Sequence, residues 1–182
     1  MKRIKFLLAG LSIVLAASTN AQETPAKRGL SVSIGPELAI PLGDFRDFYK
    51  VGLGGSAKLN LPVATNIDVS LSAGYMAFSS KGLGMIDSIQ INKNSYTFVP
   101  FKAGLRFRTG GGFYVEPQIG YTQTKIKNTE GAGFFTYAGN VGYLIGRVVD
   151  VAVRYESVSA KGGNLNFVGL RVAYNLPFAK AE

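Results

Sequence analysis

From residue 30 onward, apolar and polar side chains alternate with a period of two, and Gly-rich or polar segments interrupt the alternation. In the stretch 97–108, for example, Val99 and Phe101 share one face, whereas Lys102 and Arg106 share the other. This period is typical of β-strands with two different faces, because successive side chains of a strand point to opposite sides. Eight such runs cover residues 30–41, 51–62, 67–77, 97–108, 113–122, 134–143, 148–156 and 165–178.

The connections between these runs alternate in length. The short ones are 63–66, 109–112 and 144–147, and the longer, polar ones are 43–50, 78–96, 123–133 and 157–164. Short periplasmic turns and long extracellular loops are typical of outer-membrane barrels, and each run has about the 9–11 residues that a tilted transmembrane strand needs. We therefore predict an all-β fold, an eight-stranded antiparallel up-and-down transmembrane β-barrel with both termini on the periplasmic side. A soluble β-barrel or sandwich with an apolar interior is the alternative.

The aromatic residues of the apolar face favour the membrane interpretation, because they fall at two levels with aliphatic residues between them. Two aromatic girdles around an aliphatic band match the two interfaces of a bilayer. The polar face is rich in Gly, Ala and Ser, which suits a narrow interior. The predicted girdles consist of Tyr75, Tyr121, Tyr137 and Tyr155 near the outer ends of the strands, and of Phe107, Phe113, Tyr143 and Tyr174 near the periplasmic ends.

If the apolar face contacts lipid, the polar face lines the lumen. An isolated buried charge is costly, so the near balance of acidic and basic residues predicts an internal network of ion pairs and hydrogen bonds. Eight strands leave an interior that side chains can fill, and we expect the network to plug the lumen; a thin, charge-lined channel is the alternative. The predicted network consists of Glu37, Lys58, Asp68, Lys102, Arg106, Arg108, Glu116, Asp150, Arg154, Glu156 and Arg171.

The N-terminal segment has the pattern of a secretory signal peptide. A positive start with Lys2 and Arg3 precedes an apolar stretch of about a dozen residues at 6–17, and the small residues Thr19 and Ala21 follow it. A transmembrane helix needs about 20 apolar residues, so an uncut anchor is the weaker interpretation. We predict a cleaved signal peptide at 1–21, a lead-in at 22–29, a barrel at 30–178, and localisation in the outer membrane.

Charge and residue types exclude several function classes. The formal charge of +9 is scattered, and no run of Lys or Arg exceeds two, so we expect no nucleic-acid partner. The chain has no His and no Cys, which removes Ser-His-Asp and Cys-His nucleophile systems and the usual zinc sites. We predict that the protein is not an enzyme and has no cofactor or metal. A carboxylate pair among Glu116, Asp150 and Glu156 is the remaining enzymatic alternative.

Four segments resemble the outer-membrane β-barrel domain family, which includes OmpA/OmpX-like small barrels of porin type. They are GPELAIPLGDF at 35–45, YTFVPFKAGLR at 96–106, FYVEPQIGY at 113–121 and VGLRVAY at 168–174. The resemblance covers essentially the whole mature chain and implies outer-membrane lipid and the barrel-assembly machinery as partners.

We expect a structural or surface-interaction role, such as envelope integrity or adhesion. A narrow porin or small-solute transporter is the alternative. The loop between Phe78 and Tyr96 is the longest and includes an alternating Ser-Ile-Gln-Ile-Asn stretch at 88–92. It is either a protruding hairpin without a partner or a surface edge that pairs with another protein by strand addition.

Overall fold

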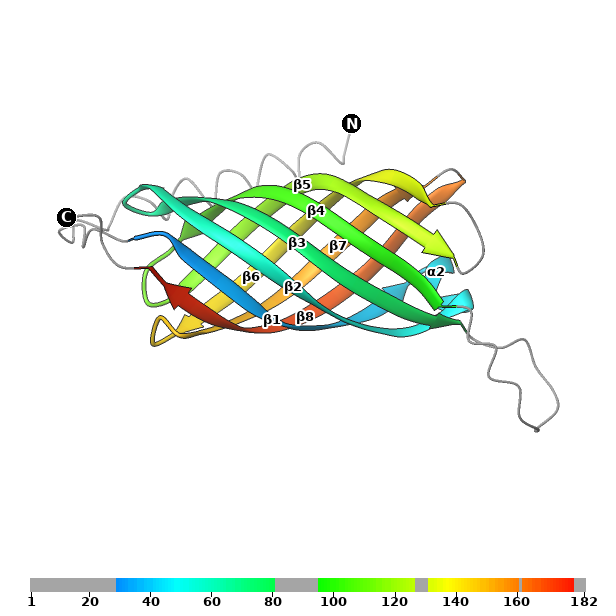
Figure 1. The fold of residues 1–182 in the computed structure, drawn as a ribbon, viewed down its shortest axis with the longest axis horizontal. Coiled ribbons are helices and arrows are strands. Elements are labelled where there is room, and N and C mark those ends of the chain that lie inside the picture. Colours follow the sequence, from blue (N-terminus) through cyan, green and yellow to red (C-terminus); the bar gives the residue numbers. More distant parts are fainter. Residues whose placement is uncertain (1–28, 81–94, 127–130, 161, 179–182) are drawn as a thin grey trace, which may run out of the picture.

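The structure, a computed structural model, describes residues 29–80, 95–126, 131–160 and 162–178, in which eight antiparallel strands form a closed barrel (Figure 1). Strands that follow one another in sequence are neighbours in the barrel, and the first strand pairs with the last. The predicted eight-stranded up-and-down barrel is confirmed. The strands are β1 (Ser31–Leu42), β2 (Tyr49–Ala64), β3 (Ile67–Ser80), β4 (Ser95–Arg108), β5 (Phe113–Ile126), β6 (Ala132–Ile145), β7 (Val149–Ala160) and β8 (Gly163–Pro177).

Closure satisfies the backbone of both terminal strands. β1 pairs with β8 in a register that runs from Ser31 opposite Pro177 to Leu42 opposite Asn166. A closed sheet has no exposed edge, so every strand has two hydrogen-bonded neighbours. The barrel therefore holds its shape in a chain that has no cysteine for disulfides.

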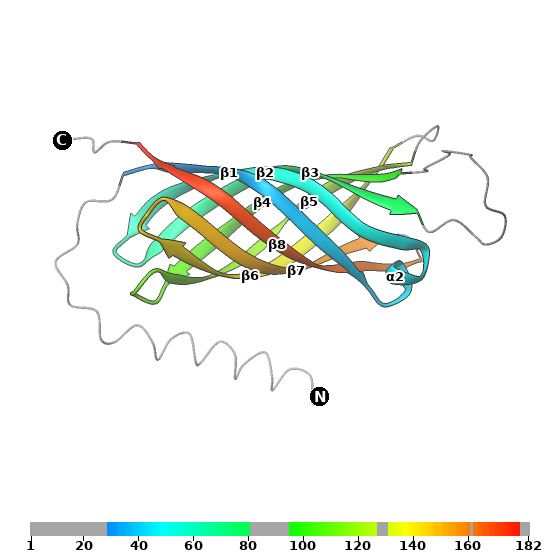
Figure 2. The ribbon, with the colours of Figure 1, turned by 90° about the horizontal axis from the view of Figure 1, so that it is seen from below.

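The two ends of the barrel differ, as the loop lengths predicted. Figures 1 and 2 show the short turns, the start of β1 and the end of β8 at one end, and the helix α2 (Asp44–Phe48) at the other. In the β4–β5 turn, Gly110, Gly111 and Gly112 have φ angles of 82°, 61° and 97°, a region that glycine adopts readily. No helix in the described part of the chain is long and apolar enough to cross a membrane.

Several strands extend further toward the end that carries α2 than the alternation predicted. β3 reaches Ser80, β5 reaches Ile126 and β7 reaches Ala160. The segment 123–126 shows why, because its Gln-Thr-Lys-Ile sequence has no apolar face that would mark it as a strand. The predicted loop 43–50 likewise contains α2 and the first residues of β2. The predicted signal peptide at 1–21, and residues 81–94 of the predicted 78–96 loop, lie outside the described residues.

The apolar face of the strands points outward and the polar face points into the barrel. Along β4, Phe101 is 54% exposed and Leu105 is 44% exposed, whereas Lys102 and Arg106 are buried. A soluble barrel or sandwich needs the opposite arrangement, with apolar residues inside. The side-chain orientation therefore supports the lipid-facing interpretation of the alternation.

Candidate functional site

Nine charged side chains form a single chain of ion pairs inside the barrel, which we call the ion-pair chain. Each member contacts residues of the opposite sign, so positive and negative groups alternate from one end to the other. Five cations and four carboxylates take part. In order, the members are Lys58, Glu116, Arg106, Asp150, Arg171, Glu37, Arg154, Glu156 and Lys102.

Arg106 lies in the first half of the ion-pair chain and joins two carboxylates. Its Nε is 2.9 Å from Oε2 of Glu116, and its Nη2 is 3.3 Å from Oδ2 of Asp150. Its guanidinium carbon is 3.8 Å from the centre of the Tyr114 ring, and the Tyr114 hydroxyl donates to Asp150 Oδ1 at 2.5 Å. Lys58 is the second cation that contacts Glu116, with its Nζ 3.0 Å from Oε2 of that carboxylate. Charged hydrogen bonds to both carboxylates offset the cost of burying them.

The second half of the ion-pair chain centres on Glu37. Arg154 binds this carboxylate with both terminal nitrogens, through bonds of 3.1 and 2.8 Å, and Arg171 Nε approaches it at 3.5 Å. Arg154 Nε also lies 2.8 Å from Oε2 of Glu156, which accepts a hydrogen bond from Lys102. A bidentate guanidinium–carboxylate contact fixes the relative orientation of β1 and β7, which lie on either side of β8.

The other two predicted lumen charges, Asp68 and Arg108, form a separate pair. Arg108 donates to Asp68 through Nε at 2.8 Å and also through Nη2. Arg108 ends β4, next to the short β4–β5 turn, and its side chain is 17% exposed. This pair therefore lies at the end of the lumen where the short turns are, which is the predicted periplasmic end, and outside the ion-pair chain.

Neutral side chains that the sequence reasoning did not single out complete the hydrogen bonding. Ser70 and Gln118 each donate to Glu116 Oε1 at 2.7 Å. Ser56 donates to Glu37 Oε1 at 2.6 Å, and the Tyr114 hydroxyl donates to Asp150 Oδ1. All four are on the inward face of their strands, so the alternation that predicted the charges was the available signal for these residues as well.

A cavity of about 10 Å³ lies beside the ion-pair chain, and a cavity of roughly this size holds one water molecule. It is lined by Glu37, Ser56, Lys58, Ser72, Ala73, Gly74, Pro100, Lys102, Gln118 and Arg154.

An apolar cluster, which we call the aromatic cap, lies at the end of the lumen that carries α2, the predicted extracellular end. Phe45 of α2 is 5.0 Å from the ring of Phe78 and stacks at 5.8 Å on Phe98. Phe167 packs 5.4 Å from Phe78. The inward position of Phe98 and Phe167 follows from the alternation, but nothing in the sequence indicates that Phe45 folds back into the barrel. The cluster consists of Ala39, Phe45, Met76, Phe78, Phe98, Val158 and Phe167, and Tyr49, Tyr96, Phe134 and Leu165 pack against it.

The predicted girdle residues all lie on the outward face of the strands. Phe107 is half-buried, and the other seven are exposed. Phe113 and Tyr143 contact each other edge to face, with ring centres 4.6 Å apart. The four residues Phe107, Phe113, Tyr143 and Tyr174 lie within three positions of the periplasmic ends of their strands.

The four outer tyrosines lie further from their strand ends. Each is five positions from the predicted extracellular end of its strand: 75 to 80 in β3, 121 to 126 in β5, 137 to 132 in β6 and 155 to 160 in β7. Five residues at about 3.3 Å each span roughly 16 Å along a strand, or about 12 Å in height at the usual tilt of transmembrane barrel strands. If the tyrosines mark the outer interface, the barrel projects beyond the membrane on this side only.

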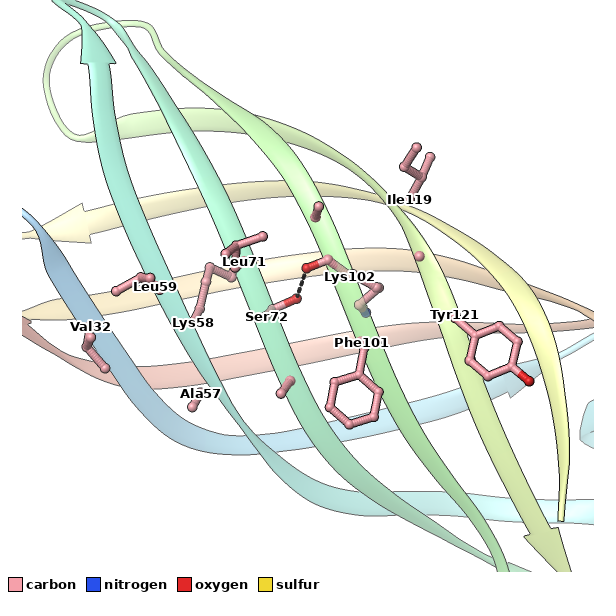
Figure 3. Close-up of a pocket in the computed structure, with 13 residues that line it drawn as sticks. Val32, Ala57, Lys58, Leu59, Leu71, Ser72, Phe101, Lys102, Ile119 and Tyr121 are labelled. Atoms are coloured by element: carbon pink, nitrogen blue, oxygen red, sulfur yellow. Dashed lines mark hydrogen bonds between the residues drawn. The ribbon is translucent and has the colours of Figure 1, made fainter.

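A second hollow, of about 630 Å³, lies on the outer wall over β2 to β5 (Figure 3). Small outward side chains such as Ala57, Ala73 and Ala103 alternate there with Leu71, Phe101 and other large ones. Its lining is mostly apolar and includes Tyr121 of the predicted outer girdle, and the exposed apolar side chains suit contact with lipid chains.

Comparisons with known proteins agree with this architecture. The sequence matches the family described as outer membrane protein beta-barrel domain over residues 6–176. A search of the curated proteins finds no match.

Solved structures show the same fold at low sequence identity. Ail, the attachment invasion locus protein of Yersinia pestis, solved with the heparin analogue sucrose octasulfate, is 15% identical with a TM-score of 0.58, over 82% of this chain and 99% of that one. The N-terminal β-barrel domain of Pseudomonas aeruginosa OprF is also 15% identical with a TM-score of 0.58, over 80% and 97%. Neisserial surface protein A is 10% identical with a TM-score of 0.55, over 82% and 97%.

The family match covers nearly the whole chain, and the fold, the outward apolar face and the closed β1–β8 pairing agree with it. The chain therefore belongs to the outer membrane protein beta-barrel domain family and is a small eight-stranded barrel of the bacterial outer membrane.

Proposed function

We propose that this protein is a closed, non-conducting outer-membrane barrel with a structural and surface-interaction role, and that its extracellular end is the surface it presents. The filled lumen carries this proposal. The ion-pair chain crosses the middle of the barrel, the aromatic cap fills its extracellular end, and the cavity beside the ion-pair chain has a volume of about 10 Å³. A solute pathway needs a continuous wet passage, and the salt bridges and packed rings of these two layers support a lumen that does not conduct.

The projecting wall supports a role at the cell surface. Beyond the outer tyrosines, the outward residues of several strands become polar, such as Gln123 and Lys125 in β5 and Asn164 in β8. Polar residues suit a wall that has left the lipid. Residues 81–94, between β3 and β4, connect two strands at this end, and we propose this connection as the contact for a surface partner. Outer-membrane lipid surrounds the barrel, and the barrel-assembly machinery is the proposed partner during insertion.

The proposal assigns no catalytic reaction to the chain. Each of the five lumen carboxylates, Glu37, Asp68, Glu116, Asp150 and Glu156, is held by at least one cation. Carboxylates that act in general acid–base chemistry need access to a substrate, whereas the side chains of all five are at most 5% exposed.

Single-channel recording in a planar bilayer tests the closed lumen. The refolded protein is first checked by electrophoresis of boiled and unboiled samples, because a folded barrel runs at a different apparent size until heat opens it. We expect no conductance steps from a preparation that passes this check. Regular, protein-dependent steps would show a pore and would replace this proposal with the narrow-porin function.

A complementation experiment separates the structural role from the surface-interaction role. Cells that lack the protein are compared with cells that carry either the full chain or a variant in which residues 81–94 are replaced by a Gly/Ser segment of equal length. We expect the variant to restore envelope integrity, measured as leakage of a periplasmic enzyme, but not adhesion of the cells to a surface. Equal adhesion by both versions would contradict the assigned contact segment.

A further inference from the structure

The ion-pair chain has one more cation than it has carboxylates. With every member in its charged form, its five cations and four carboxylates give a net charge of +1, and every member is at most 8% exposed. The separate Asp68–Arg108 pair is neutral and does not compensate this charge. A net charge enclosed in a barrel wall and surrounded by lipid is strongly unfavourable unless an opposite charge lies close to it.

The excess positive charge gathers at the 10 Å³ cavity. Three cations line it, Lys58, Lys102 and Arg154, against one carboxylate, Glu37. Lys58 and Lys102 lie in one row across the sheet, because Lys58 is opposite Ser72 in the β2–β3 register and Ser72 is opposite Lys102 in the β3–β4 register. Two strand spacings of about 4.8 Å separate their backbones, and both side chains line the cavity. Figure 3 shows Lys58, Ser72 and Lys102 on these three neighbouring strands.

The groups around the cavity have hydrogen-bond donors to spare. An ammonium group carries three donors. Lys58 Nζ uses one of them on Glu116, and Lys102 Nζ uses one on Glu156. Glu37 cannot take up the rest, because Oε1 accepts from Ser56 and Arg154 and Oε2 accepts from Arg154. The remaining ammonium donors suit a ligand that accepts hydrogen bonds.

The geometry points to a binding site for a small monovalent anion of chloride size, held by Lys58 and Lys102 inside the lumen. One such anion neutralises the ion-pair chain, and it accepts the spare donors of both ammonium groups. Ser72 and Gln118 complete the polar lining. The cavity is too small for a sulfate or a phosphate and has about the size of one water molecule, so a monatomic ion fits best.

Anomalous diffraction with bromide is the direct test. Crystals of the refolded full-length barrel are soaked in sodium bromide, and a map is calculated at the bromine absorption edge. We expect one peak between the Nζ atoms of Lys58 and Lys102, and no such peak in Lys102→Met. Density for a water molecule without an anomalous signal, in wild-type crystals at saturating bromide, would overturn the proposal. This outcome does not depend on the variant.

Thermal unfolding gives a second readout that does not need crystals. The temperature of the electrophoretic band shift is measured in sodium chloride and in sodium gluconate at equal ionic strength, because gluconate is too large for the cavity. An anion that binds only the folded barrel raises the melting temperature as its concentration increases. We expect this chloride dependence in the wild type and its loss in Lys102→Met, in which the ion-pair chain is neutral.

Arg108→Gln is the matched control, since it also removes one lumen cation but lies outside the ion-pair chain. It should retain the chloride dependence. Loss of the dependence in both variants would mean that total charge, and not this cavity, is responsible, and would refute the site. A pore found by conductance would leave the bromide result unaffected, so the two proposals fail separately.

Discussion

Replacing Arg106 by alanine tests the ion-pair chain at its most buried cation. Arg106 is 1% exposed and joins Glu116, Asp150 and the ring of Tyr114. Its removal leaves both carboxylates buried with one cation fewer each. Glu116 keeps Lys58 at 3.0 Å, and Asp150 keeps Arg171 at 3.4 Å.

The expected loss of stability follows from these contacts. Removal of one partner of a buried ion pair typically costs about 3–5 kcal/mol, because the remaining charge is uncompensated. Lys58 and Arg171 remain on the two carboxylates, and Arg106→Ala leaves the ion-pair chain with four cations and four carboxylates, which both lower this cost. The lost contact with Tyr114 raises it, by about 0.5–2 kcal/mol for a cation over an aromatic face. We therefore expect a decrease of about 3–5 kcal/mol in the free energy of unfolding.

Guanidinium titration of the refolded barrel in detergent micelles measures this decrease, with the fraction of the folded electrophoretic band as the readout. At a typical slope for guanidinium, the expected loss corresponds to a midpoint about 1 M lower. Arg108→Ala is the matched control, because Arg108 is partly exposed at the periplasmic end and water can reach Asp68 in its place. We expect it to cost only about 1 kcal/mol.

A double-mutant cycle with Glu116→Gln shows whether the pair itself is responsible. Contacting residues in one ion-pair network usually couple by about 0.5–3 kcal/mol. An Arg106→Ala barrel that unfolds at the wild-type midpoint, or a coupling energy of zero with Glu116, would refute the reasoning that the lumen charges support one another.

Three further predictions concern the cap, the interior and the lipid face. Phe45→Ala removes the ring that joins α2 to Phe78 and Phe98. We expect faster proteolysis within residues 44–48, while the folded barrel still shows its heat-dependent band shift on electrophoresis. An unchanged cleavage rate would show that α2 is held by other contacts. Gly120→Ala places a Cβ 2.0 Å from the Phe101 carbonyl oxygen, whereas nothing lies within 4 Å of a Cβ at Gly139. We expect Gly120→Ala to lower the refolded fraction and Gly139→Ala to leave it unchanged. Equal refolding yields of the two variants would count against the close packing of β4 and β5. Val153→Arg introduces a charge in the aliphatic band and should lower the free energy of unfolding in lipid vesicles by about 2–4 kcal/mol, against about 0–1 kcal/mol for Phe113→Arg near the periplasmic interface. Similar decreases at the two positions would mean that the membrane depth inferred from the girdles is wrong.

The sequence by itself determined the strands, their faces and the order in which they pair. The period of two in β4 separates Phe101 from Lys102 because side chains of a strand alternate between two faces, and this local rule holds whatever the strand packs against. The alternating loop lengths then define an up-and-down barrel, since short connections require neighbouring strands to be antiparallel. The alternation also gave the inward position of each predicted lumen charge, although not the partner of any one of them.

The tertiary structure decided which groups meet inside the barrel and where the strands end. Arg154 binds Glu37 at a separation of 117 residues, and no local pattern specifies this pair, because it depends on the register and tilt of every strand between them. Phe45 reaches Phe98 only because the segment after β1 turns back into the lumen as α2. The strand ends beyond the outer tyrosines were also hidden from the sequence, since residues such as those at 123–126 have no apolar face and are held as strands by backbone pairing with β4 and β6.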